Sequence, residues 1–183
     1  YNTAVGFDAG NAVTTGIQNT LVGGLAGDAL LAAADNVAVG FEALSTETGG
    51  QNNVAIGPRA LKAQVNSSGN IYNTAVGANA GTAVTTGIQN VLIGGLAGDA
   101  LTDADFNVAV GTSALSADTL GSQCTALGHG ALEAQNFTTA TQANNTAVGF
   151  LAGDGVTTGK FNLFAGALAG RSTTNGTSNI LMG

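Results

Sequence analysis

Few residues of this chain have the chemistry to bind or transform a ligand, and they are scattered. The 183 residues include one histidine, His129, and one cysteine, Cys124. No serine–histidine–aspartate grouping, pair of carboxylates or cysteine cluster occurs at a spacing that supports catalysis. A single histidine with no further ligand near it in sequence is a poor metal site. The sequence therefore predicts no enzymatic activity, no cofactor and no metal centre.

Three aspartates recur at equivalent positions, directly after an Ala-Gly pair. They are Asp28, Asp99 and Asp154, and Arg171 takes the same place once. Calcium needs six to eight clustered oxygen ligands, and single aspartates so far apart in sequence do not supply them. We expect these residues to be surface charges or turn formers.

The polar residues best suited to a ligand lie in two stretches, residues 65–71 and 136–143. Each follows the shared sequence Ala-Leu-x-Ala-Gln, at 60–64 and 131–135. Loops on a rigid scaffold often carry binding residues. Candidates for contact with a glycan or another surface ligand are Asn66, Ser67, Ser68, Phe137, Thr138 and Thr139. The two stretches differ in sequence, which favours the alternative of solvated insertions without a binding role.

Aromatic side chains form a third group of candidates. Phe7, Phe41 and Phe150 each follow a short repeated motif, and His129 occupies the same variable position. An exposed aromatic ring there could stack on a sugar. Packing against a neighbouring turn or chain is the interpretation that we favour for the three phenylalanines.

A repeated pentamer must position all of these residues. It reads NTAVG at residues 2–6 and returns ten times, mostly with substitutions such as NVAVG and NVAIG. The copies are seventeen positions apart except for two longer steps, which end at Asn73 and Asn145. Its opening residues are Asn2, Asn19, Asn36, Asn53, Asn73, Asn90, Asn107, Cys124, Asn145, Asn162 and Asn179. Its closing residues are Gly6, Gly23, Gly40, Gly57, Gly77, Gly94, Gly111, Gly128, Gly149, Gly166 and Gly183.

A longer period is superimposed on the short one. The Ala-Gly or Ala-Leu pair that follows each pentamer keeps one order over four units, and this order starts again at Asn73 and at Asn145. Four units therefore make one module. The chain, 1–183, is a single continuous array with modules 2–72 and 73–144 and a partial module 145–183. Because it begins and ends inside the repeat, we expect it to be a fragment of a longer chain.

The pentamer has the pattern of a short β-strand. Thr or Val and Val or Ile alternate with a small residue, usually alanine, and each pentamer ends in glycine, which disfavours a helix. A strand, a turn and a return in every unit predict one turn of an all-β, parallel β-solenoid. We expect the glycines to turn the chain, the asparagines to stack in an amide ladder, and Cys124 to be a small apolar replacement rather than a reactive thiol.

Composition limits the partners. Four basic against eleven acidic residues give a net charge of −7, which excludes nucleic acid as a partner. The apolar runs are too short to insert this segment into a membrane. A coil as short as one unit encloses a small core, and small cores rarely fold alone. We therefore expect identical chains to associate, and the alanine side of the strands is the predicted contact.

The pentamers NTAVG, NVAVG and NVAIG, each followed by x-x-Ala-Gly or x-x-Ala-Leu, resemble the head repeats of YadA-like trimeric adhesins. They are still closer to the NTAVG-type repeats of bacteriophage tail fibres, because the adhesin heads have a shorter period than this chain. The resemblance covers the whole chain. It implies a left-handed β-roll, a homotrimer, and an extracellular role in attachment to a glycan or protein receptor on a host surface.

Two alternatives remain open from the sequence. One is the head of a bacterial trimeric surface adhesin. The other is an ice-binding solenoid, which is suggested by the Thr-Thr pairs beginning at Thr14, Thr85, Thr157 and Thr173. Such a surface needs a regular array on successive turns, and these pairs recur irregularly.

Overall fold

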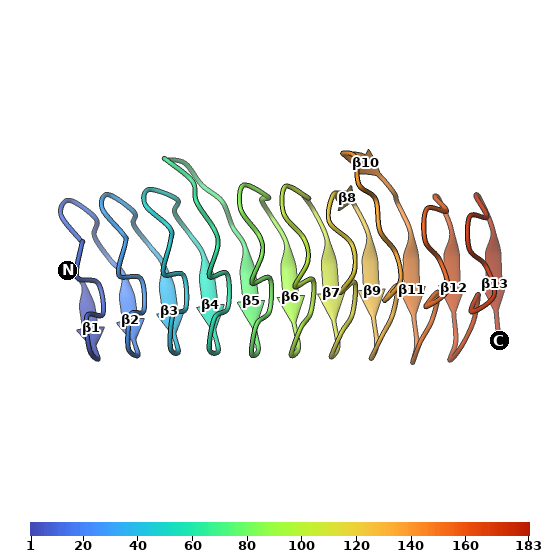
Figure 1. Ribbon diagram of the computed structural model, residues 1–183, viewed down its shortest axis with the longest axis horizontal. Helices are drawn as coiled ribbons and strands as arrows, with labels where there is room; N and C mark the ends of the chain where they lie inside the picture. The colour runs from blue at the N-terminus through green and yellow to red at the C-terminus, as the bar shows by residue number, and fades with distance from the viewer.

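The alternating residues of each pentamer form a three-residue strand, because β-branched side chains suit a pleated surface and the closing glycine ends it. The computed structural model describes all of residues 1–183. The chain winds into a rod of about eleven turns, here called rungs, which are stacked side by side (Figure 1). Equivalent residues of successive rungs, such as Asn19 and Asn36, are usually seventeen positions apart. The predicted parallel β-solenoid is confirmed.

Eleven strands form one sheet in chain order, and two short strands form a second. The main sheet contains β1 (Thr3–Val5), β2 (Thr20–Val22), β3 (Val37–Val39), β4 (Val54–Ile56), β5 (Thr74–Val76), β6 (Val91–Ile93), β7 (Val108–Val110), β9 (Thr125–Leu127), β11 (Thr146–Val148), β12 (Leu163–Ala165) and β13 (Ile180–Met182). The second contains β8 (Gly121–Ser122) and β10 (Thr141–Gln142). All pairs are parallel, and each residue pairs with its own equivalent, such as Ala38 with Ala55. The chain has no helix long and apolar enough to cross a membrane.

Rungs are hydrogen-bonded around most of their perimeter and not only through the strands. Of 112 backbone hydrogen bonds, 21 join strand residues to one another, and in the other 91 at least one partner lies outside the strands. Many of these join corresponding segments of successive rungs, such as the Gly10 N–H to the Ala26 carbonyl and the Thr102 N–H to the Thr119 carbonyl. The irregular return segment is therefore held in the same register as the sheet.

The strand alanines face the interior of the rod, so the prediction that they form the contact between chains is wrong. Ala38, Ala75 and Ala109 have no exposed surface and belong to the core cluster of 31 buried residues. The Thr, Val and Ile side chains on either side of each alanine point outward. The close approach that selects alanine comes from the return segment of the same chain, because the two walls of so short a turn leave little room between them.

In seven rungs the interior is filled by a complementary choice at two facing positions. Where the middle strand residue is large, as with Leu21, Leu92 and Phe164, the position six residues later is glycine. A Cβ on Gly98 would lie 2.7 Å from the Leu92 side chain. Where the middle strand residue is alanine, the later position holds a fully buried leucine in four rungs, at Leu44, Leu61, Leu115 and Leu132. Each pair in these rungs thus supplies one large side chain. In the other three complete rungs both positions are small, and large side chains of adjoining rungs fill the space, as Leu92 does beside Gly81.

A column of asparagines connects the rungs inside the rod. The Asn73 Oδ1 accepts hydrogen bonds from the Asn90 backbone N–H at 2.8 Å and from the Asn90 Nδ2 at 3.3 Å. Asn90 Nδ2 also donates to the Ala104 carbonyl across the same rung at 2.8 Å. The Asn90 side chain has no exposed surface. Asn90 therefore ties two rungs together and also closes its own rung, as most asparagines of the column do.

The glycine at the end of each strand lies against the glycine of the next rung. Gly94 has a φ of +134°, and a Cβ there would lie 2.5 Å from the backbone carbonyl of Gly111. Both the conformation and the close contact exclude a side chain. This contact recurs along the rod and keeps the rungs at the spacing of a parallel sheet, about 4.8 Å.

We expect Asn90→Ala to lower the free energy of unfolding by about 2–6 kcal/mol. The substitution leaves the buried Ala104 carbonyl and Asn107 N–H without partners, and each unsatisfied buried group costs about 1–3 kcal/mol. Chemical denaturation checks this, with the exposed Asn11→Ala as the matched control. Equal stability of the two variants would contradict a structural role for the column.

The core pairing predicts that one substitution rescues another. Leu92→Ala removes a buried leucine and should cost about 2–5 kcal/mol, whereas Gly98→Leu overfills the rung and should cost about 1–3 kcal/mol. The double variant recreates the Ala–Leu pairing of the next rung, where Leu115 already has a φ of +56°. It should be more stable than either single variant in thermal unfolding. Additive losses would refute the pairing.

Candidate functional site

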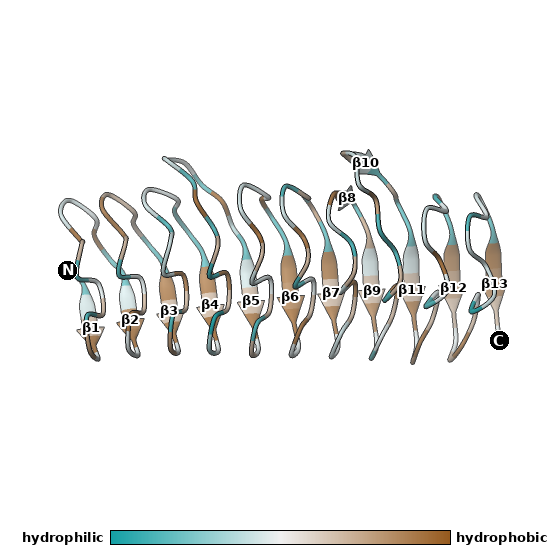
Figure 2. Cartoon of the chain, in the orientation of Figure 1, coloured by the Kyte–Doolittle hydropathy of each residue, from teal (hydrophilic) through white to brown (hydrophobic).

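The outer face of the main sheet is a continuous surface that the fold leaves uncovered. We call it the strand face; it consists of the outward side chains at the first and third positions of β1–β7, β9 and β11–β13. They are Thr, Val, Ile, Leu, Ala and Met, and none is charged. Ile93 is 38% exposed and Leu127 is 44% exposed. The strands include some of the most hydrophobic segments of the rod (Figure 2).

Two insertions project beyond the other return segments at one edge of the rod, four rungs apart (Figure 1). The first insertion is residues 65–71 and the second is residues 136–143. Within the second, β10 pairs with β8 of the preceding rung, whereas the first has only an isolated bridge between Gln51 and Asn70. Both insertions are therefore joined to the rod by backbone pairing.

A fully buried glutamate anchors the first insertion. Glu47 Oε1 accepts hydrogen bonds from the backbone N–H groups of Thr48, Gly49, Gly50 and Asn66 at 2.8–3.0 Å. Its Oε2 accepts from Gln64 Nε2 at 2.8 Å. Gln64 Oε1 in turn accepts from Asn73 Nδ2 at 2.9 Å, which joins this network to the asparagine column.

The second insertion uses the same device with an aspartate. Asp118 Oδ1 accepts from the Gly121 and Phe137 N–H groups, and Oδ2 accepts from Gln135 Nε2 at 2.5 Å. Gln135 Oε1 accepts from Asn145 Nδ2 at 2.7 Å. Burial raises the pKa of Asp118, and the hydrogen bonds that it accepts oppose that rise.

The two anchors differ in length, and their surroundings compensate. A Cβ on Gly50 would meet the Glu47 carboxylate and the Ile71 side chain, and a Cβ on the equivalent Gly121 would meet the Asp118 carboxylate and the Phe137 ring. Beside the longer Glu47, the neighbouring space is filled by Ile71. Beside the shorter Asp118, the corresponding space is filled by the larger Phe137.

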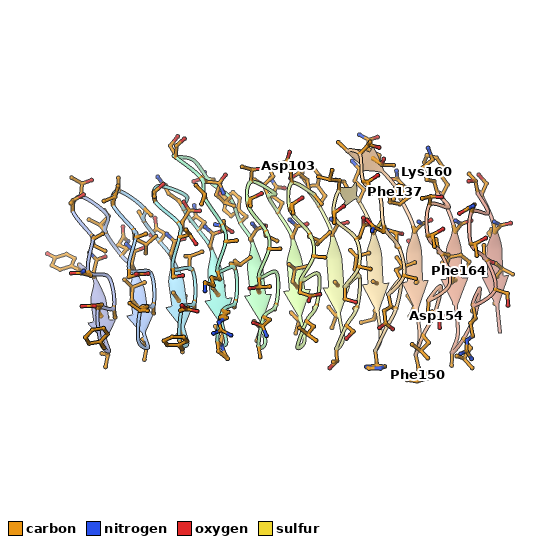
Figure 3. All side chains as sticks on the ribbon, in the orientation of Figure 1. Asp103, Phe137, Phe150, Asp154, Lys160 and Phe164 are labelled. Carbon is orange, nitrogen blue, oxygen red and sulfur yellow. The ribbon has the colours of Figure 1, made fainter.

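This burial removes Phe137 from the set of surface candidates. The ring is 6% exposed and belongs to the core cluster, beside β10 (Figure 3). Asn66 is half-buried and its backbone N–H binds Glu47. Ser67, Ser68, Thr138 and Thr139 are exposed, so they are free to contact a ligand. They lie on two separate insertions and do not form one site.

The anchoring network was not among the features predicted from the sequence, although the sequence contains a signal for it. Eleven residues after the start of each unit, the first module has Val13, Leu30, Glu47 and Gln64, and the second has Val84, Leu101, Asp118 and Gln135. A carboxylate and an amide thus interrupt an apolar column in both modules, and the amide directly precedes each insertion. Buried polar groups of this kind require partners.

Cys124 replaces an asparagine in the column and is buried. Its backbone N–H binds Asn107 Oδ1 at 2.9 Å, and Gln135 Nε2 lies 3.2 Å from its Sγ. Burial raises the pKa of this thiol to about 11, so it is protonated at neutral pH. A protonated, buried thiol is a weak nucleophile.

The aromatic residues that follow the pentamers lie along the turn opposite the insertions, where Phe150 reaches the edge of the rod (Figure 3). Phe7, Phe41 and Phe150 are 77%, 49% and 53% exposed. His129 stacks on Phe150 with ring centroids 5.5 Å apart, and the Arg59 guanidinium lies 6.0 Å from the centre of the Phe41 ring. Each pair joins successive rungs. No three His, Cys, Asp or Glu side chains come together in a way that could hold a metal ion.

The recurring aspartates are more buried than surface charges would be. One carboxylate oxygen of each of Asp28, Asp99 and Asp154 is buried without a hydrogen-bond partner. Burial raises the pKa of Asp28 and of Asp99. Arg171 Nε lies 3.6 Å from Asp154 Oδ2. The three aspartates belong to the second, sixth and ninth rungs, so they are too far apart to share an ion.

Threonines form a partial column near the edge that carries the insertions, but their hydroxyls are already used. The Oγ1 atoms of Thr85 and Thr102 donate to the carbonyls of Thr102 and Thr119, and Thr14 donates to Leu31 in the same way. Leu31, Val65 and Asn136 interrupt the column. This arrangement does not favour an ice-binding surface.

Comparison with known proteins gives no match. No family model fits the chain, and neither a curated protein nor a solved structure is found to be similar to it.

We expect Asp118→Asn to lower stability by about 1–3 kcal/mol, because its Nδ2 would face the Gln135 Nε2 donor. Rotating the Gln135 amide by 180° does not remove the problem, because its Nε2 would then face the Asn145 Nδ2 donor. In the double variant Asp118→Asn/Gln135→Glu, the new carboxylate at position 135 accepts from the Nδ2 groups of both position 118 and Asn145. This variant should recover most of the stability lost in Asp118→Asn. Urea denaturation of the three proteins measures this. A double variant no more stable than Asp118→Asn would contradict the proposed order of donors and acceptors.

Proposed function

We propose that the chain is a segment of a homotrimeric extracellular fibre that attaches to a host surface. The fibre is of the tail-fibre type, and each chain forms a left-handed β-solenoid. The observation that carries this proposal is the bare, uncharged strand face. Parallel sheets are almost always covered on both faces, and contiguous apolar patches on proteins usually mark an interaction site. In the single chain, one face of this sheet covers the core and the other has no cover.

Identical chains are the cover that fits this face best. The strand face repeats at every rung, so another copy in register presents the same side chains at the same spacing. A chain with a net charge of −7 repels its own copies, and the strand face is where that repulsion is least, because its side chains carry no charge. Closed rotational symmetry is the usual outcome for identical chains. The number three comes from the resemblance to trimeric fibres.

A trimer built in this way leaves the insertions and the aromatic turns available. Both lie at the edges of the rod, away from the centre of the strand face (Figure 1). Ser67, Ser68, Thr138 and Thr139 are among the exposed insertion residues that would be available to a receptor. Three chains would present each insertion three times, so weak contacts could add to a firm attachment.

We expect the wild-type chain to have a solution mass three times its 17.7 kDa in sedimentation equilibrium. Ile93→Lys should shift the mass toward the monomer, because the trimer would bury three like charges together, whereas a single chain already exposes this side chain. The exposed Thr112→Lys adds the same charge on a turn and should remain trimeric.

A monomeric wild type would overturn the trimer. An Ile93→Lys variant with the wild-type mass would show that the chains associate through some other surface. Circular dichroism of each variant distinguishes dissociation from unfolding.

A further inference from the structure

The second insertion overhangs a hollow of about 230 Å³ beside the starts of β7 and β9. It is lined by Asp105, Phe106, Ser122, Gln123, Ala140, Thr141 and Gln142. The pairing of β10 with β8 holds the overhanging residues in place. The hollow is smaller than the roughly 300–1,000 Å³ pockets of drug-sized ligands, so it suits a single small ring.

The lining combines one aromatic ring with several hydrogen-bonding groups. Phe106 is 46% exposed. Asp105 Oδ1 accepts from the Ile88 N–H at 2.8 Å, which fixes the carboxylate. Ser122 Oγ accepts from the Asp105 N–H at 3.0 Å and keeps its own proton to donate. Gln123 and Gln142 are exposed and add an amide on each side.

This combination matches the two sides of a sugar ring. The C–H face of a hexose is apolar with slightly positive hydrogens, which favours the negative face of an aromatic ring. Its hydroxyls both donate and accept hydrogen bonds, as the amides and the serine hydroxyl do, and they can also donate to the carboxylate, which only accepts. Asp105, in a chain of net charge −7, disfavours an acidic sugar.

The first insertion provides an internal comparison. Ala34 and Asp35 stand there in place of Asp105 and Phe106, and Asn52 and Asn70 in place of Gln123 and Gln142. Asn52 Nδ2 donates to Asn70 Oδ1 at 2.8 Å, which joins the rod to the insertion across the equivalent space. A second hollow, of about 430 Å³, lies over β11–β13 around Phe161, and no carboxylate lines it. An insertion therefore does not create such a hollow by itself.

We propose that the hollow under the second insertion binds one neutral hexose unit of a surface glycan, with Phe106 under the ring and Asp105, Gln123 and Gln142 around its hydroxyls. The proposal rests on the proposed function, since it names the ligand class and the place of the attachment. In a trimer the site occurs three times, and weak binding at each copy gains from avidity.

Phe106→Gln tests the site with little risk to the fold. Glutamine already occupies the same position in neighbouring rungs, at Gln89 and Gln123, with φ of +57° and +64°. The matched control is Phe161→Gln, which changes a similarly exposed ring (54%) at the equivalent position of another rung. Each protein is checked by circular dichroism and sedimentation. It is then applied to an array of neutral and acidic glycans and to whole bacterial cells.

The wild type should bind neutral glycans in preference to sialylated or uronic-acid glycans. Phe106→Gln should weaken that binding about tenfold or more, and Phe161→Gln should leave it unchanged. Glycan binding unaffected by Phe106→Gln, lost equally in both variants, or strongest for acidic glycans would overturn the sugar site while leaving attachment intact. A wild type that binds neither glycans nor cells would overturn the attachment function itself.

Discussion

Register between rungs is the constraint on which the rest of the structure depends. Each residue lies beside the equivalent residue of the next rung. A residue type that recurs in successive rungs must therefore pack well against another residue of the same type. Asparagine meets this condition because its amide both donates and accepts along the column, as Asn73 and Asn90 do. Glycine meets it at the strand end, where Gly94 lies against the backbone of Gly111. The same condition excludes stacked charges from the interior unless a partner of different chemistry follows.

The two modules show what happens where that condition is broken. Glu47 and Asp118 cannot stack on another carboxylate, and in both modules a glutamine follows in the next rung. The carboxylate binds backbone N–H groups of its own turn and of the insertion, which would otherwise be buried without partners. The amide passes the hydrogen bonding on to the asparagine column. An insertion is thus stabilised by a polar group placed one rung before it.

The strands and their register could be predicted from the sequence, because spacing alone aligns the pentamers. Which side of the strand faces inward could not, since Thr3, Ala4 and Val5 alternate in the same way whichever face is buried. The larger Val and Ile residues would be expected inside an ordinary core, but so short a turn is too narrow for them at every rung. The insertions at 65–71 and 136–143 were visible as extra length. The burial of Phe137 was not, because it depends on the length of the Asp118 side chain in a neighbouring rung.

The fixed position of the insertions within each module has a consequence for how such a rod can vary. Extra residues occur only in the fourth rung, after the glutamine that its predecessor's carboxylate engages. Gain or loss of a whole four-rung module would therefore change the length in steps of about 19 Å, four strand spacings. Each added or removed module would add or remove one insertion. The contacts between neighbouring rungs would stay of the kinds already present. Reach and number of presented loops would then increase together, by simple duplication.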